Sequence, residues 1–165
     1  MSVVGEGTVV EMHFPAAPAD VVEPLEIPVL AAPPRGSSAQ RILVVEDDAD
    51  VRRVIVECLG LIGYSVTEAP NGRSGIDALR AQKPDLLMVD YAMPDITGAE
   101  VISLAREMYV ELPVILATGY ADMAAVERLA GKPVILRKPF DIKTLGDAVA
   151  AALDGAREKA VSAGA

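Results

Sequence analysis

Four short apolar runs lie in the chain after residue 40, and each is followed directly by charged or hydroxyl-bearing residues. The runs are 42–45, 86–89, 114–117 and 134–136, and the residues that follow them are Glu46-Asp47-Asp48, Asp90, Thr118 and Arg137-Lys138. Unbroken Ile, Leu and Val runs are typical of strands covered on both faces, as in a parallel sheet between helices. Ligands bind such sheets at the carboxyl ends of the strands. The pattern therefore predicts that these polar side chains meet at one edge of a sheet.

Helical patterns alternate with the strands and predict the order (βα)5. Strands are expected at 41–46, 64–68, 85–89, 114–117 and 134–137. Helices are expected from Asp48 or Asp50 to Ile62, from a cap at Asn71 to Ala81, from a capping box of Thr97 and Glu100 with the connection ending at Pro113, at 122–129, and from a cap at Asp141 to Leu153. Right-handed crossovers turn such a unit into a parallel sheet with helices on both faces. The predicted fold class is therefore α/β, a doubly wound, five-stranded parallel sheet.

The segment 15–40 differs in composition from the rest of the chain. It holds six prolines among Ala, Val and acidic residues. Proline lacks an amide donor and favours extended backbone, so this segment is predicted to be a Pro/Ala-rich linker within a mostly disordered N-terminal extension. The folded domain is expected at 41–154, with a flexible tail at 155–165.

Charge and hydropathy narrow the classes of partner. The net charge is −9, which argues against nucleic-acid binding because no basic stripe is available to neutralise a phosphate backbone. No apolar stretch reaches the roughly 18 residues of a membrane span, and the N-terminus lacks a signal-peptide pattern, so a cytoplasmic location is expected. The single Cys58 shares an apolar helical stripe with Val54, Ile55, Leu59 and Ile62 and is expected to be a buried core thiol.

The acids at the strand ends predict a metal site. Glu46, Asp47 and Asp90 would place three carboxylates close together. Two unit charges about 4 Å apart repel by about 4 kcal/mol at an effective dielectric constant of about 20, so the cluster needs a proton or a cation. Mg²⁺ fits best, because it takes oxygen ligands and is commonly held by carboxylates together with phosphate oxygens. No His or Cys stands nearby to favour zinc.

The remaining residues at these strand ends suit phosphoryl chemistry. Asp90 begins an exposed loop, where a carboxylate can attack phosphorus and form an aspartyl phosphate. Thr118 can donate its hydroxyl to one phosphoryl oxygen, and Lys138 can place an ammonium on another.

Four motifs within 41–154 resemble the receiver domain of two-component response regulators. They are RILVVEDD at 41–48, DYAMPDITG at 90–98, ATG at 117–119 and KPF at 138–140. The resemblance implies a flavodoxin-like fold with strand order 2-1-3-4-5. It also implies that Asp90 is the phosphoacceptor, and that Asp47, Asp90 and the Ala92 backbone carbonyl bind Mg²⁺. Glu46 would act on the metal through water, while Thr118 and Lys138 would engage the phosphoryl group.

Two departures from the family pattern concern the expected switch residues, which are Thr118, Tyr120 and Ile135. The family usually carries an aromatic residue three positions before the lysine, where this chain has Ile135. Tyr120 either replaces that aromatic in part or is a half-exposed loop residue. The segment between Thr118 and Lys138 is short, which predicts a reduced fourth helix. These features resemble receivers attached to hybrid kinases and some free-standing ones. Ala92 and Tyr120 together predict slow loss of the phosphoryl group.

Residues 1–14 resemble the end of a histidine-kinase ATP-binding domain. Gly5-Glu6-Gly7-Thr8 precedes an alternating apolar stretch and Pro15, as in the last glycine box and final strand of that domain. The alternative is a poorly ordered leader with a strand-forming stretch. His13 is expected to be a strand residue and not a phosphodonor. Neither ATP binding nor kinase activity is expected from this chain alone.

The function predicted from these features is that of a phosphorelay receiver. It would accept a phosphoryl group on Asp90 from a histidine kinase or histidine phosphotransfer protein and would act on a downstream protein in trans, without a DNA-binding output domain. A homodimer through the face of the fourth helix, fifth strand and fifth helix is one expected assembly. Two alternatives stay open. One is an aspartyl-phosphate hydrolase of the haloacid-dehalogenase type, using the D-x-D pair Asp48 and Asp50. The other is a non-phosphorylated interaction module.

Overall fold

The computed structural model describes residues 2–3, 7–8, 40–119 and 132–163. Its elements are β1 (Ser2–Val3), β2 (Gly7–Thr8), β3 (Arg41–Val45), α1 (Ala49–Leu61), β4 (Ser65–Ala69), α2 (Gly72–Ala81), β5 (Leu86–Asp90), α3 (Gly98–Met108), β6 (Val114–Thr118), β7 (Val134–Arg137) and α5 (Ile142–Ala163). The linker up to residue 39, the fourth helix expected at 122–129, and Tyr120 lie outside the described residues.

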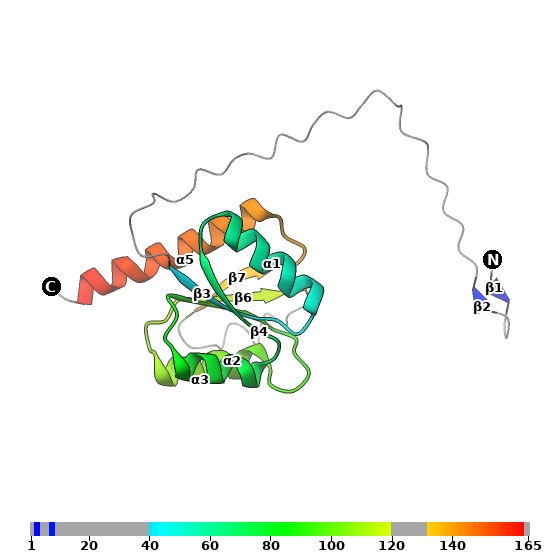
Figure 1. The fold of residues 1–165 in the computed structure, drawn as a ribbon, viewed down its shortest axis with the longest axis horizontal. Coiled ribbons are helices and arrows are strands. Elements are labelled where there is room, and N and C mark those ends of the chain that lie inside the picture. The colour runs from blue at the N-terminus through cyan, green and yellow to red at the C-terminus, as the bar shows by residue number, and fades with distance from the viewer. Residues whose placement is uncertain (1, 4–6, 9–39, 120–131, 164–165) are drawn as a thin grey trace, which may run out of the picture.

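The five strands after residue 40 form one parallel sheet in the order β4-β3-β5-β6-β7. Numbered within the sheet, this is the order 2-1-3-4-5, so the predicted topology is confirmed. Helices α1 and α5 cover one face of the sheet, and α2 and α3 cover the other (Figure 1). The strand order reverses its direction between β3 and β5, and ligand sites of open α/β sheets lie at such a point.

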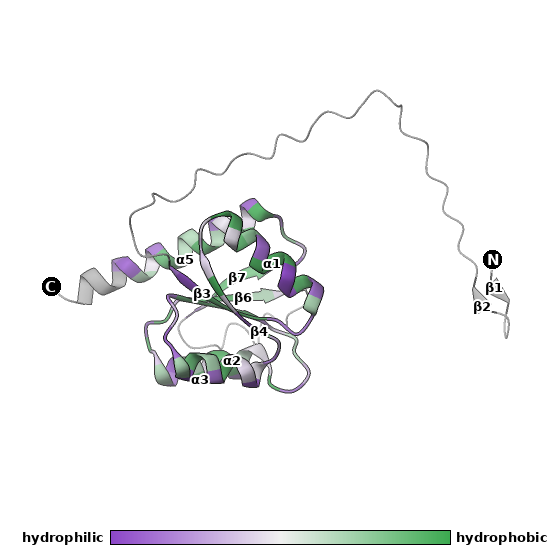
Figure 2. Cartoon of the chain, in the orientation of Figure 1, coloured by the Kyte–Doolittle hydropathy of each residue, from purple (hydrophilic) through white to green (hydrophobic). Residues whose placement is uncertain are grey.

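Each face of the sheet carries its own hydrophobic cluster. Ile42 and Val44 of β3 pack toward α1 and α5, whereas Leu43 and Val45 pack toward α2 and α3. Because side chains alternate between faces along a strand, a strand with two covered faces must be apolar at every position. All five residues of β5 and of β6 are buried accordingly. Figure 2 shows hydrophilic stretches on the helices beside hydrophobic ones, as expected of helices with one covered side.

Local capping fixes the beginnings of the helices as predicted. The Asp48 carboxylate accepts the amide hydrogens of Asp50 and Val51, at 2.9 and 3.0 Å, and so caps α1. The Asn71 side chain caps α2. Thr97 and Glu100 form a full capping box at the start of α3. Since these bonds satisfy amides that have no partner within the helix, they can be predicted from short stretches of sequence.

The C-terminal helix corrects one prediction. Helix α5 continues to Ala163, beyond the expected end at Leu153, so most of the segment 155–165 is helical. The residues after Leu153 contain no proline, and most are good helix formers. Gly155 costs about 1 kcal/mol relative to alanine, which does not end a helix with such neighbours.

The exposed side of α1 corrects another. Val54 is 58% exposed and Cys58 is only half-buried, although Cys58 packs against the cluster beneath α1 and α5. The residues of α1 that face the sheet are Ile55 and Leu59, joined by Ile62 just after the helix. The apolar stripe on this helix is therefore wider than the surface that the sheet covers.

The remaining described elements are the two short strands near the N-terminus. Ser2 pairs with Thr8 and Val3 with Gly7 in an antiparallel arrangement. The apolar stretch after Thr8, with His13, lies outside the described residues. In the described part of the chain, no helix combines the length and the apolar character that crossing a membrane requires.

Candidate functional site

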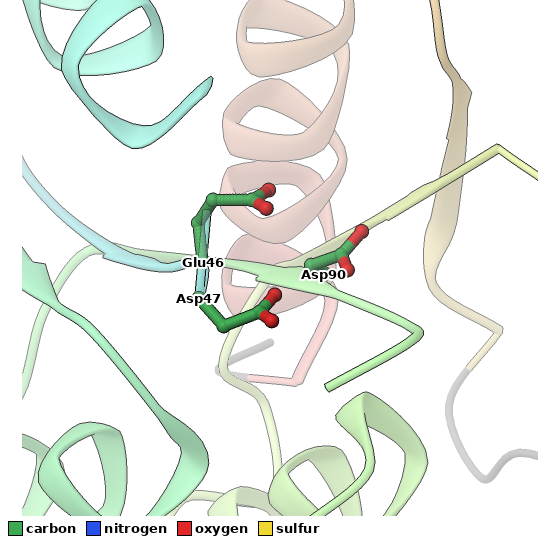
Figure 3. A group of neighbouring side chains, drawn as sticks. All are labelled: Glu46, Asp47 and Asp90. Carbon is green, nitrogen blue, oxygen red and sulfur yellow. The ribbon is translucent and has the colours of Figure 1, made fainter. Parts of the chain in front are cut away.

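The adjacent strands β3 and β5 bring three acids together at the carboxyl edge of the sheet. Glu46, Asp47 and Asp90 each offer a carboxylate oxygen within 4.8 Å of the other two (Figure 3). Glu46 is 2% exposed and Asp90 is 7% exposed, whereas Asp47 is exposed. The three carboxylates therefore lie close together, as predicted. Water and ions can reach the cluster from the side of Asp47.

Lys138 joins this cluster from the end of β7. Its Nζ lies 2.7 Å from Oε2 of Glu46 and 2.8 Å from Oδ1 of Asp90. Burial lowers the pKa of Lys138, but its bonds to Asp90 and Glu46 outweigh that effect, so the pKa lies above its ordinary value. For Glu46, burial has the opposite effect and raises the pKa, while the hydrogen bond from Lys138 partly offsets that rise. Lys138 is therefore an ammonium at neutral pH and balances part of the charge of two buried acids.

Thr118 occupies the same edge at the end of β6 and is 4% exposed. Its backbone carbonyl accepts the amide hydrogen of Lys138 at 2.8 Å, and the neighbouring carbonyl of Ala117 accepts that of Tyr91 at 2.9 Å. These bonds fasten the loops after β5 and β7 to β6. The edge thus gathers the acids, the hydroxyl-bearing residue and the lysine that the sequence predicted.

The loop after β5 holds Asp90 in place. Oδ2 of Asp90 accepts the amide hydrogen of Ala92 at 3.2 Å, and the Gly98 amide donates to the Tyr91 carbonyl at 3.1 Å. A Cβ on Gly98 would lie 2.2 Å from the Asp90 carbonyl oxygen, so no larger residue fits there without a shift of the backbone. Gly98 therefore allows α3 to begin against the backbone of Asp90.

The donor set suits Mg²⁺. All three acids offer hard oxygen ligands, and Asp47 leaves the site open to the waters that Mg²⁺ retains. Lys138 compensates only part of the negative charge, because three carboxylates face one ammonium. A divalent cation would supply the remaining compensation.

The D-x-D pair does not belong to this cluster. The Asp48 carboxylate is engaged as the cap of α1, and its bonds from the Val51 and Asp50 amides lower its pKa. The Asp50 side chain is 91% exposed and lies 3.8 Å from Arg53. Neither acid is placed as the nucleophile of an enclosed site, which argues against the hydrolase alternative.

Two features near the site are absent from the sequence-based prediction. Arg52 donates to the backbone carbonyls of Glu46 and Asp47, a contact that no motif of the sequence signals. A groove of about 540 Å³ also lies beside Lys138, and its lining is mostly apolar. It is lined by Asp50, Val51, Val54, Ile55, Lys138, Pro139 and Phe140. The groove could not be predicted from the sequence, because the exposure of Val54 depends on how α1 packs on the sheet.

Ile135, one of the expected switch residues, is half-buried in β7 and packs against the cluster beneath α2 and α3. The structure thus places an aliphatic side chain against the core where the family usually has an aromatic one. The part that Tyr120 plays stays a prediction, because that residue lies outside the described part of the chain.

Fold and site together define a flavodoxin-like α/β protein with an acid cluster and a lysine at the carboxyl edge of its sheet. A sequence model of the response regulator receiver domain matches residues 42–150. The chain therefore belongs to the response regulator receiver domain family.

Similar proteins agree with this assignment. The chain is 36% identical to the response regulator receiver protein CpdR of Brucella abortus (strain 2308) over 108 residues, 64% of this chain and 90% of that protein. It is 30% identical to the sporulation initiation phosphotransferase F of Bacillus subtilis (strain 168) over 112 residues, 67% of this chain and 90% of that protein. The crystal structure of a CheY-like receiver domain protein from Methanospirillum hungatei JF-1 matches with a TM-score of 0.70 and 26% identity, covering 74% of this chain and 99% of that one.

The family places the chain in two-component phosphorelay signalling. Receiver domains take phosphoryl groups from histidine kinases or phosphotransfer proteins, and they bind Mg²⁺ in the acidic pocket. The domain is accordingly a signalling domain.

Proposed function

We propose that this chain accepts a phosphoryl group on the carboxylate of Asp90 from a phosphohistidine donor, in a reaction that depends on Mg²⁺. The observation that carries the proposal is the setting of Asp90. Its carboxylate is 8% exposed, lies 2.8 Å from the Lys138 ammonium and accepts the Ala92 amide, and it faces two further acids. A carboxylate so surrounded by positive donors and metal ligands is suited to accept phosphorus.

The reaction balances as a transfer between two proteins. A carboxylate oxygen of Asp90 attacks phosphorus, the phosphorus–nitrogen bond of the donor breaks, and the leaving imidazole nitrogen keeps the electron pair and takes up a proton. The product is an aspartyl phosphate. Asp47, Asp90 and the Ala92 carbonyl would hold the metal, with Glu46 acting through water. Bound there, Mg²⁺ would neutralise the charge of the incoming phosphoryl group.

Lys138 and Thr118 are the proposed ligands of the phosphoryl oxygens. Lys138 already contacts Oδ1 of Asp90, so a small movement would bring its ammonium to a phosphoryl oxygen. Thr118 ends the neighbouring strand β6 and would offer its hydroxyl. Recruitment of both would alter the loops after β6 and β7. With Thr118, Tyr120 and Ile135 as the proposed switch residues, the domain would then shift between two conformations that a downstream protein in trans can tell apart.

The groove beside Lys138 is the proposed docking place of the phosphodonor. A histidine kinase or phosphotransfer protein must bring its phosphohistidine to Asp90, and the apolar lining by Val54, Pro139 and Phe140 reaches the edge of the site at Lys138. The proposed homodimer face includes β7 and α5, and the groove borders it, because Lys138, Pro139 and Phe140 lie between those two elements.

Phosphoryl labelling of variants tests the proposal. Phosphoramidate, a small donor with a phosphorus–nitrogen bond, with Mg²⁺ should add one phosphoryl group to the wild-type chain, as measured by intact mass. Asp90→Asn should abolish the addition, whereas the matched variant Asp48→Asn should keep it, because Asp48 only caps α1. Full labelling of Asp90→Asn, or loss confined to Asp48→Asn, would refute the assignment.

A further inference from the structure

Arg52 ties together three segments around the acid cluster. It lies near the start of α1, and its Nη1 donates to the carbonyl oxygens of Glu46, at 2.8 Å, and Asp47, at 3.4 Å. Its Nε donates to Oε2 of Glu68 at 3.1 Å, near the end of β4. The side chain is only 16% exposed. One guanidinium thus joins the helix, the loop that carries two of the acids, and the neighbouring strand.

The loop bends at the two residues whose carbonyls Arg52 binds. Strand β3 ends at Val45, although the Glu46 amide still donates to the Ala69 carbonyl at 3.1 Å. Successive side chains of a regular strand point to opposite faces. Glu46 and Asp47 are successive, yet both carboxylates turn toward Asp90 (Figure 3). The backbone must therefore leave strand geometry here, and its carbonyls lose their ladder partners.

We infer that Arg52 is a positioning residue for the metal site. By holding the carbonyls of Glu46 and Asp47, it fixes the bend that turns both carboxylates toward the ion, and Glu68 orients its guanidinium. The planar fork of arginine presents several donors in a fixed geometry, which the single ammonium of a lysine does not reproduce. The inference rests on the proposed function, because the ion concerned is the one that would assist phosphoryl transfer to Asp90.

A purely electrostatic role for Arg52 makes the opposite prediction. A positive charge near the acid cluster repels a cation, so its removal would strengthen Mg²⁺ binding if charge were all that mattered. If Arg52 positions the ligands, its removal weakens Mg²⁺ binding in spite of the lost repulsion. The sign of the change therefore separates the two roles.

The test is a titration with Mg²⁺ alone, in which NMR monitors the amide chemical shifts of Asp47 and Ala92. Arg52→Met and Arg52→Lys are both expected to weaken binding by about 10-fold or more, as is common when a residue that supports a metal ligand is removed. The matched control is Arg53→Met, which removes the same charge from the next residue, whose side chain is 69% exposed. It should bind Mg²⁺ as the wild type does or slightly more tightly.

Equal or tighter binding by a folded Arg52→Met or Arg52→Lys overturns the inference and leaves the proposed function intact. If urea titration shows that Arg52→Met is not folded, Mg²⁺ binding by Arg52→Lys and Glu68→Gln tests the inference instead. Each of these variants keeps part of the contact that joins Arg52 to Glu68 and to the loop carbonyls. Glu68→Gln should weaken Mg²⁺ binding less than Arg52→Lys does. If neither variant weakens Mg²⁺ binding, the inference is overturned. Failure of the wild-type chain to bind Mg²⁺ would instead refute the proposed function, and the inference with it.

Discussion

The contact between Gly98 and the backbone of Asp90 gives the sharpest prediction about the site. A Cβ at position 98 would lie 2.2 Å from the Asp90 carbonyl oxygen, 2.9 Å from its carbonyl carbon and 3.0 Å from Cα of Tyr91. All three neighbours are backbone atoms, so no side chain can rotate away. Real Cβ contacts essentially never fall below 3.0 Å, and the loop or the helix must therefore move by at least 0.8 Å, the difference between 3.0 and 2.2 Å.

This displacement acts directly on the proposed phosphoacceptor. Gly98→Ala should cost about 1–3 kcal/mol of stability, as is usual when a packed site is overfilled. A misplacement of about 1 Å costs about 100-fold in rate at a reacting centre, so labelling by phosphoramidate should slow by about that factor in a protein that remains folded. The matched control is Gly60→Ala, because a Cβ at Gly60 meets nothing within 4 Å.

Urea denaturation followed by circular dichroism measures the stability, and intact mass over time measures the labelling. Gly60→Ala should label at the wild-type rate and gain up to about 1 kcal/mol of stability, since alanine favours the helix over glycine. If folded Gly98→Ala labels as fast as Gly60→Ala, the close approach of α3 does not position Asp90, and the reasoning fails.

Two further predictions concern charge. Lys138→Met removes the ammonium that bridges Glu46 and Asp90 and should lower stability by about 2–3 kcal/mol, less than for a fully buried pair because the lysine side chain is 23% exposed. Mg²⁺ should then raise the melting temperature of Lys138→Met more than that of the wild type, and equal shifts would contradict the shared role of ion and lysine. The pKa of Asp48 is lowered in the folded state by the amides of Val51 and Asp50, so its contribution is present above the ordinary value of 3.8 and is lost as the pH falls through the lower folded value. Asp48→Ala should therefore be less stable than the wild type at pH 7, and this difference in stability should shrink in acid. Asp48→Asn keeps an uncharged cap. A difference between Asp48→Ala and the wild type that stays constant down to pH 2 would contradict the reasoning.

Much of the fold could be predicted because its signals are local. The unbroken apolar runs of β5 and β6 leave no polar position for solvent, which requires two covered faces. The caps at Asp48, Asn71 and Thr97 act within three residues of the chain. Helix α5 extends beyond the expected end at Leu153, because the residues that follow contain no proline and most are good helix formers.

For the site as well, local signals predicted which residues take part, whereas their contact partners could not be predicted. The placement of acids, a threonine and a lysine after successive strands predicted a shared edge, because parallel strands end together. The partner of each residue could not be predicted. Lys138 is 92 positions from Glu46 in the sequence, and their bond depends on the side chain reaching across the edge of the sheet. The hold of Arg52 on the loop after β3 and the exposure of Val54 depend on how α1 sits against the sheet.

The amino-acid sequence by itself determined the alternation of strands and helices, the helix caps and the set of residues that gather at the carboxyl edge. Each of these follows from hydrophobic periodicity or from hydrogen bonds between near neighbours in the chain. The tertiary structure alone decided which acids share the lysine, which arginine braces the bend that carries Glu46 and Asp47, and which apolar side chains remain outside the core. Those contacts join segments far apart in the sequence, and their geometry is set by the packing of helices on the sheet.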